Sequence, residues 1–176
     1  MTADFGHARR VYAESFGQPG QRTFRIRLEG SAGETAALWL EKQQVQALEM
    51  ALGQMLAQLE YEPAAPPGME GFPQDPEHEF KVGRMSMGYD HSDGRVLLHA
   101  YDLTDDENAP PEVTTKLSPD QCGVLRSQLT DIIAGGRPVC PLCDSPIDAS
   151  GHACIRSNGH RDEPVPRLDD EEDYEA

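Results

Sequence analysis

Several stretches of the chain alternate apolar and polar residues with the period of two that is typical of β-strands. The clearest is 23–28, where Phe24, Ile26 and Leu28 face one way while Arg25 and Arg27 face the other. The same criterion predicts strands, in chain order, over 10–16, 23–28, 35–40, 80–89, 95–103 and 113–117. Glycine- and proline-containing or Asp/Gly-containing turns separate most of them, so we expect the strands to follow one another antiparallel.

Each set of three strands is followed by a segment with helical periodicity. The first helix is predicted over 42–59, and its apolar stripe is Val45, Leu48, Leu52, Met55, Leu56 and Leu59. The second helix has explicit start signals: Ser118 as N-cap, Pro119 in the first turn and Gln121 completing a capping box. Gly135-Gly136 ends it.

The two halves match in register when they are shifted by 77 residues. The shift superimposes Leu40 on Leu117, Gln44 on Gln121, Leu48 on Leu125, Leu52 on Leu129, Met55 on Ile132 and Leu56 on Ile133. It also places Cys122 on Val45, which predicts a buried apolar position for Cys122 rather than a ligand or a nucleophile. The sequence therefore predicts an α+β domain over 1–136, in which two strand-strand-strand-helix repeats (about 10–62 and 79–136) form a six-stranded, mainly antiparallel sheet with two helices. A proline-rich linker, 63–78, joins the repeats and is either a functional flap or a simple connector.

A dense group of soft metal ligands follows the second helix. Cys140-Pro141-Leu142-Cys143 is a Cys-x-x-Cys knuckle, and Cys154 follows after a short spacer. This spacing is typical of a structural zinc site. A segment of about 20 residues buries too little apolar surface to fold alone, so a bound metal would supply its folding free energy. We therefore predict a zinc-ribbon-like module over 137–161.

The fourth ligand is His160 or His152, and spacing alone does not decide between them. The turn-forming Asn158-Gly159 favours His160 because it could fold the chain back onto the cysteines. A disulfide or a redox-active pair is the competing interpretation of the knuckle. We prefer zinc, because a redox Cys-x-x-Cys opens a helix in an α/β unit, whereas here prolines flank the motif and no such unit surrounds it.

Composition narrows the classes of function. The chain of 176 residues carries a net charge of -16, which weighs against binding to nucleic acids or anionic membranes. Residues 169–175 contribute six acids and no bases, and we expect 162–176 to be a disordered acidic tail. No signal-peptide pattern or long apolar run is present in the sequence, and the cysteines are clustered as ligands, so we expect a cytoplasmic protein without a membrane segment.

Four stretches of the chain resemble an uncharacterised bacterial family, domain of unknown function 3090. They are Gly-Gln-Pro-Gly-Gln-Arg-Thr-Phe (17–24), Leu-Glu-Lys-Gln-Gln-Val (40–45), Gly-Arg-Pro-Val-Cys-Pro-Leu-Cys (136–143) and Gly-His-Ala-Cys-Ile-Arg-Ser-Asn-Gly-His-Arg (151–161). The resemblance covers about 11–161, and the C-terminal motif is its most specific part. It implies a source among high-GC Gram-positive bacteria and gene neighbours that resemble a histidine phosphatase and a kinase. The family supplies no catalytic or cofactor-binding residue.

Candidate catalytic groups are scattered along the chain. Asp90, His91 and Asp93 lie close together, but in a predicted hairpin turn, where Asp and Gly serve the backbone. Arg22, Arg25 and Arg27 form a row that could bind a phosphate, although a solvated strand face is the simpler interpretation. Neither the nucleophile elbow Gly-x-Ser-x-Gly nor a phosphate-binding glycine loop occurs in the sequence.

Three functions remain. The first is a non-catalytic, zinc-stabilised binding or adaptor protein with a protein partner. The second is an enzyme, or an enzyme subunit, that acts on a small phosphorylated metabolite through the arginine row. The third is a nucleic-acid-binding zinc module with Arg137, Arg156 and Arg161 at its edge, and the acidic net charge weighs against it.

Overall fold

The computed structural model describes residues 1–135, 140–145, 147 and 151–156. Contacts divide the chain into two compact units, Met1–Gly136 and Arg137–Ala176, which are described separately. The predicted acidic tail, 162–176, lies outside the described residues, as does His160.

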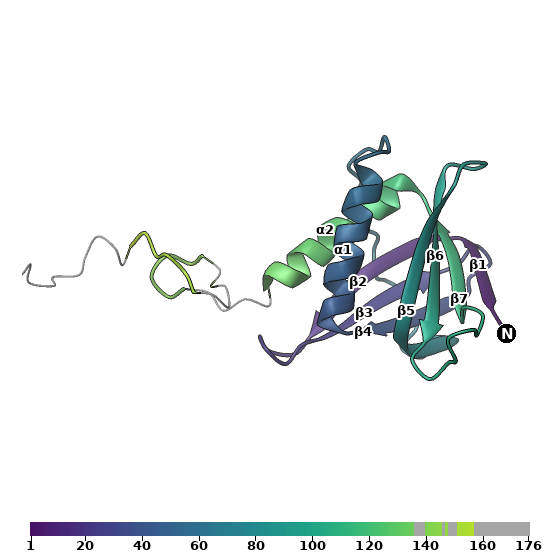
Figure 1. The fold of residues 1–176 in the computed structure, drawn as a ribbon, viewed down its shortest axis with the longest axis horizontal. Helices are drawn as coiled ribbons and strands as arrows, with labels where there is room; N and C mark the ends of the chain where they lie inside the picture. The colour runs from purple at the N-terminus through teal and green to yellow at the C-terminus, as the bar shows by residue number, and fades with distance from the viewer. Residues whose placement is uncertain (136–139, 146, 148–150, 157–176) are drawn as a thin grey trace, which may run out of the picture. The chain divides into compact units, whose positions relative to one another are not determined.

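The first unit is a mixed sheet of seven strands with two helices (Figure 1). Its strands are β1 (Ala3–His7), β2 (Arg10–Phe16), β3 (Thr23–Glu29), β4 (Thr35–Leu40), β5 (His78–Asp90), β6 (Arg95–Asp102) and β7 (Val113–Leu117). They lie in the order β1-β7-β6-β5-β4-β3-β2. The α+β class, the six predicted strands and both helices are confirmed, with most boundaries within two residues.

The prediction of six strands is wrong by one, because β1 was not expected. In β1 only Phe5 is fully buried, and the local sequence has no run of alternating apolar residues. The strand forms because it pairs in parallel with β7, more than a hundred residues away. β4 and β5 make the other parallel pair, and the remaining four pairs are antiparallel.

The sheet is curled, and its two edge strands, β1 and β2, are consecutive in the sequence. Ala8 and Arg9 alone separate β1 from β2. The backbone N–H of Ala8 donates to the carbonyl of Lys116 in β7 at 2.9 Å, while that of Arg9 donates to the carbonyl of Glu29 in β3 at 2.8 Å. Two neighbouring residues thus bond to opposite ends of the strand order and hold the curled sheet closed.

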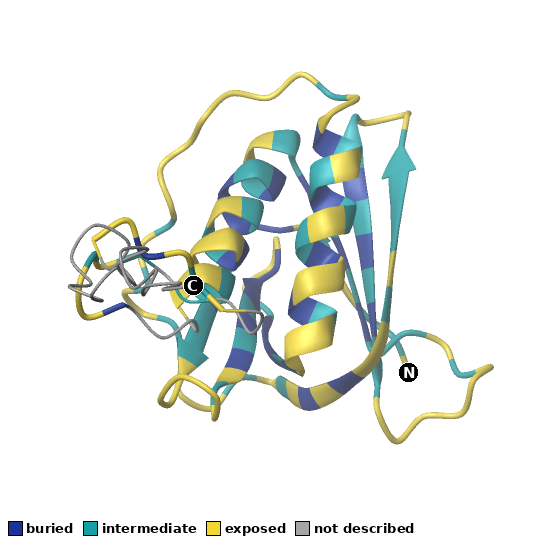
Figure 2. Ribbon diagram, turned by 60° about the vertical axis from the view of Figure 1, so that its left-hand side comes forward, coloured by how far each residue is buried: buried dark blue, intermediate teal, exposed yellow. Residues whose placement is uncertain are grey.

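Both helices lie on the same side of this sheet and pack against each other (Figure 1). They are α1 (Lys42–Leu56) and α2 (Pro119–Gly135), and the buried bands along each follow the predicted apolar stripes (Figure 2). Cys122 is completely buried among them, as its register predicts, and burial raises the pKa of its thiol to about 12. Gly53 leaves room for the guanidinium of Arg126 on α2, because a Cβ there would lie 2.8 Å from Nε of Arg126, which pairs with Glu49 on α1 at 3.0 Å.

A glutamine at the start of each helix ties the helix to the sheet. Gln121 accepts from the N–H of Ser118 at 2.9 Å and completes the predicted capping box, while its Nε2 donates to the carbonyl of Ala8 at 2.7 Å. Gln44 accepts from the N–H of Glu41 at 2.8 Å, and its Nε2 donates to the carbonyl of Val82 at 2.7 Å. The same side chain therefore makes the same two kinds of contact in both halves.

The proline-rich linker lies against the sheet edge. Arg10 of β2 donates to the carbonyls of Gly68 and Glu70 at 2.9 and 2.8 Å, and its guanidinium lies 4.7 Å from the ring centre of Phe72. These contacts hold the middle of the linker in place. Neither helix in the described part of the chain is long and apolar enough to cross a membrane.

Candidate metal centre

Four side chains of the second unit converge on one point. Sγ of Cys140, Cys143 and Cys154 and a ring nitrogen of His152 all lie within 4.8 Å of one another. Cys140 and Cys154 are buried, whereas Cys143 and His152 are partly exposed. This arrangement brings together the three cysteines and one of the two histidines expected from the sequence.

The backbone of the knuckle explains how two of these sulfurs face the same point. The N–H of Asp144 donates to the carbonyl of Cys140 at 2.9 Å, and the N–H of Cys140 donates to the carbonyl of Ser145 at the same distance. Asp144 adopts φ 57°, a left-handed conformation that closes the turn. Arg156, two residues after Cys154, donates to the carbonyl of Leu142 at 2.8 Å and links the two halves of the cluster.

The geometry fits a tetrahedral metal. Sγ of Cys140 and Sγ of Cys154 are 3.8 Å apart, whereas a disulfide joins its sulfurs at about 2 Å. Two thiolates on a zinc ion with bonds of about 2.3 Å would be separated by roughly 3.8 Å. No disulfide joins the described cysteines, so their sulfurs can serve as metal ligands.

The surroundings of Cys143 favour its thiolate. The hydroxyl and the backbone N–H of Ser145 donate hydrogen bonds to its sulfur and, with the neighbouring thiols, lower its pKa to about 7. A thiolate is the form that binds metals. His152 Nε2 lies 3.0 Å from this sulfur, which places the imidazole in the ligand set at its exposed side.

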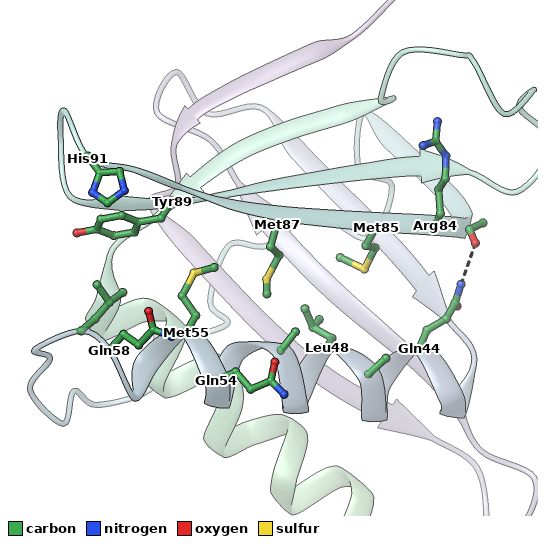
Figure 3. Close-up of a pocket in the computed structure, with 14 residues that line it drawn as sticks. Gln44, Leu48, Gln54, Met55, Gln58, Arg84, Met85, Met87, Tyr89 and His91 are labelled. Atoms are coloured by element: carbon green, nitrogen blue, oxygen red, sulfur yellow. Dashed lines mark hydrogen bonds between the residues drawn. The ribbon is translucent and has the colours of Figure 1, made fainter.

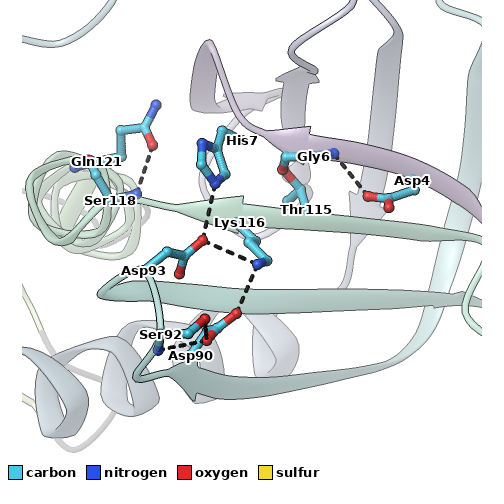
Figure 4. Close-up of polar contacts among 10 residues, drawn as sticks. All are labelled: Asp4, Gly6, His7, Asp90, Ser92, Asp93, Thr115, Lys116, Ser118 and Gln121. Carbon is cyan, nitrogen blue, oxygen red and sulfur yellow. Dashed lines mark hydrogen bonds and ion pairs between the residues drawn. The ribbon is translucent and has the colours of Figure 1, made fainter.

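The candidate catalytic group of the β5–β6 hairpin serves a different purpose. Asp90 and Asp93 both accept from Nζ of Lys116, at 2.8 and 3.1 Å, and Asp93 also pairs with His7 at 3.1 Å (Figure 4). The ring of His91 packs edge-on against Tyr89 instead of joining them. The two carboxylates therefore link the β5–β6 hairpin to β7 and β1 at this end of the sheet.

The arginine row is likewise occupied. Arg25 and Arg27 both bind Oε1 of Glu14, at 2.6 and 2.7 Å. Only 13% and 16% of their side chains are exposed, and the Arg25 guanidinium lies 4.7 and 4.9 Å from the ring centres of Phe16 and Trp39. Arg22 donates to Ser15 and, at 2.6 Å, to the carbonyl of Ile132 near the end of α2. The interpretation as a solvated strand face is wrong, because aromatic rings and Glu14 cover these cations.

A cavity that sequence reasoning did not identify lies between α1 and β5. Its volume is about 730 Å³, and its apolar walls come mainly from Leu48 and Met55 of α1, from Leu59 just after α1, and from Met85 and Met87 of β5 (Figure 3). Two small residues of α1, Ala47 and Ala51, also line it. The available signal was the 77-residue register, which places these alanines opposite the larger Val124 and Gln128 of α2.

Comparison with known proteins identifies a family and no individual relative. None of the curated proteins compared with the chain matches it. A family model described as "Protein of unknown function (DUF3090)" matches residues 3–154. The match begins in β1 and ends at the third clustered cysteine, so it includes the curled sheet, both helices and the whole Cys/His cluster. The chain therefore belongs to the DUF3090 family.

Proposed function

We propose that the protein is a zinc-stabilised binding or adaptor protein that recognises a protein partner and catalyses no reaction itself. The observation that carries the proposal is the convergence of Cys140, Cys143, His152 and Cys154. Four protein ligands complete a tetrahedral shell and leave no open position for a substrate, which is the arrangement of structural zinc sites. In this proposal His152 is the fourth ligand.

The exposed residues of the metal unit support a role in binding. Leu142 is 53% exposed and Ile155 is 83% exposed, and each stands next to a ligand cysteine. Apolar side chains held on a rigid metal-bound turn lose little conformational entropy when a partner covers them. The occupied arginine row gives the alternative, an enzyme for a phosphorylated metabolite, no free cation at Arg25 or Arg27.

The metal is the first testable part. Protein purified without added metal is expected to contain about one zinc ion per chain by elemental analysis. Cys140→Ser should lose the zinc, while Cys122→Ser, which changes a buried cysteine outside the cluster, should retain it. Iron-sulfur absorbance, or a metal-free protein with a Cys140–Cys143 disulfide, would contradict the assignment.

The binding role is tested by double substitution of Leu142 and Ile155 with serine. Crosslinking and mass spectrometry in native cells should show a defined partner on the wild-type protein. The double variant should lose that partner while its zinc content and melting temperature stay unchanged, and Met50→Ser, an exposed apolar change in the other unit, should retain it. Turnover of a phosphorylated metabolite that is lost on Arg25→Ala would overturn the proposal in favour of an enzyme.

We also infer that the first unit arose by internal duplication. The element order after β1 is strand-strand-strand-helix twice, which supports this inference. So do Gln44 and Gln121, which stand 77 residues apart and make corresponding contacts with Val82 and Ala8.

A further inference from the structure

The cavity between α1 and β5 contains one feature that its volume alone does not reveal, an unpaired strand edge. β5 pairs with β4 only from His78 to Lys81, and beyond Lys81 the two strands are no longer paired. The remainder of β5 pairs only with β6, through Met85–Ala100, Met87–Leu98 and Tyr89–Val96 among others. The question is which backbone groups of β5 point away from β6.

The register answers it. The carbonyl of Ala100 accepts from the N–H of Glu112 at 2.9 Å, so Ala100 directs its backbone groups away from β5. In an antiparallel ladder, residues directly opposite each other both point inward or both point outward. Met85 therefore directs its N–H and C=O away from β6, and so do Met87 and Tyr89, at intervals of two residues.

These three residues make no hydrogen bond on that side within the described part of the chain. The side chain of Gln44 satisfies the carbonyl of Val82, at the closed end of the cavity. Beyond it the donors and acceptors of three alternate residues form a row of about 13 Å. An unpaired edge is a template for another strand, and proteins generally shield such edges unless they are used.

The edge strand β2 shows how this protein shields an unpaired strand edge. The N–H of Ala13 in the edge strand β2 donates to Oε1 of Gln128 on α2, at 2.9 Å. The 77-residue spacing that separates the two capping glutamines places Ala51 on α1 where α2 has Gln128. Ala51 carries no group that could reach β5, so the cavity remains open along the strand edge.

We propose that the groove between α1 and β5 binds an extended, uncharged apolar peptide segment of a partner protein, which adds to the sheet beside Met85, Met87 and Tyr89. The backbone of β5 would supply the hydrogen bonds, and alternate side chains of the segment would enter the apolar space between the methionines and the helix. Methionine suits this role because its flexible thioether side chain adapts to different apolar shapes.

The lining of the groove defines the chemistry of the segment. Its single formally charged residue, Arg84, is already engaged, because its guanidinium stacks 3.6 Å from the ring centre of Tyr101 and donates to the carbonyl of Glu107 at 2.9 Å. The other polar lining residues are Gln44, Gln54, Gln58, Tyr89 and His91. Among the described residues no carboxylate lines the groove, so nothing there recognises a basic segment, and the engaged Arg84 offers little to an acidic one. This proposal rests on the binding function proposed above and assigns it a second surface.

The test uses short random peptides displayed on phage and selected on the full-length protein. An enriched peptide, synthesised and titrated, should bind wild type, and Ala51→Gln should weaken it by about tenfold or more. The glutamine would occupy the groove and cap the strand edge as Gln128 does on β2. Met50→Gln, an exposed change on the same helix outside the groove, should leave binding unchanged. Ala47→Val fills the groove from a second position, and melting curves establish that each variant is folded.

Amide hydrogen exchange supplies the specific signature. Bound peptide should slow exchange at the N–H groups of Met85, Met87 and Tyr89, the three that point away from β6. Failure to enrich a peptide, or a peptide that ignores Ala51→Gln or leaves these amides unprotected, would overturn the proposal. It would also be overturned by the uncharged dye Nile red binding where no peptide does, which would indicate a small-molecule site, or by a groove-dependent dimer in sedimentation. None of these outcomes depends on zinc or on Leu142 and Ile155, so the two proposals fail separately.

Discussion

Lys116 forms ion pairs with two carboxylates on the surface of the sheet. Its ammonium group lies between Asp90 and Asp93, and its hydrogen bond to Asp90, together with those from Ser92, holds the pKa of Asp90 far below its ordinary value of 3.8. For Asp93, loss of solvent pulls the pKa upward, but hydrogen bonds from Lys116 and His7 outweigh it and the pKa is also lowered. The pKa of Lys116 is raised by the same two partners.

The cluster should make stability depend on acid. A carboxyl group whose pKa is lowered in the folded state stabilises the fold above its unfolded pKa, and that contribution disappears as the pH falls through the folded value. The urea midpoint of wild type should therefore fall as the pH is lowered from about 5 to about 2. Lys116→Met should flatten this dependence, whereas Lys81→Met, an exposed lysine on β5, should not. Parallel pH curves for the three proteins would contradict the prediction.

Single residues also mark where the sequence was sufficient and where it was not. The Cys-x-x-Cys spacing identified two members of the cluster, because a short turn fixes the distance between its two sulfurs, and the following Cys154 supplied the third. The choice between His152 and His160 depended on how the spacer folds, which no local pattern encodes; the structure brings His152 to the cysteines. The partners of Arg25 and Arg27 were missed because Glu14 and the aromatic rings come from other strands.

At the scale of elements, the glutamines at the helix starts connect each helix to the sheet. Gln121 satisfies the helix terminus with its Oε1 and the sheet with its Nε2. Its acceptor, the carbonyl of Ala8, belongs to the short segment that closes the curled sheet. One side chain thereby fixes the position of α2 relative to the closure.

Gln121→Glu separates these two roles. The carboxylate retains an acceptor for the N–H of Ser118 but cannot donate to Ala8, so the free energy of unfolding should fall by about 1–3 kcal/mol. Gln44→Glu should have a similar effect at Val82. Gln46→Glu, on the exposed side of α1, should stay within about 0.5 kcal/mol of wild type by urea denaturation. An equal loss for Gln46→Glu and Gln121→Glu would indicate that added negative charge, not the lost donor, is responsible.

Element boundaries were predicted best where the alternation is strong and both strand ends have turn residues. β2, β4 and β7 match their predicted ranges; β2 and β7 bury alternate residues on one face, while β4 is buried along almost its whole length. The parallel pairs β4–β5 and β1–β7 have no comparable local signal. β1 gains its stability from pairing with β7, so its own five residues did not indicate a strand.

At the scale of the molecule, the first unit holds its core entirely within its own residues. The buried apolar cluster extends from Phe5 to Leu129, and Cys140 and Cys154 are not members of it.

Residues 1–136 are thus expected to fold alone. A chain ending at Gly136 should unfold cooperatively in urea, within about 0.5 kcal/mol of the corresponding transition in the full-length protein. As an internal calibration, Leu129→Ala in the same fragment should cost about 2–5 kcal/mol, because Leu129 is 1% exposed. A fragment that binds hydrophobic dyes and unfolds without a sharp transition would show that the metal unit completes the core.

The parallel pairing of β1 with β7 sets an order of events during synthesis on the ribosome. Ala3 emerges early, but its partner Val113 leaves the exit tunnel only after more than a hundred further residues have been added. Until then β1 has no strand to join, and the closure at Ala8 and Arg9 cannot form. Contacts between distant parts of a chain form slowly. β1 therefore cannot complete its native pairing until nearly the whole first unit has been synthesised.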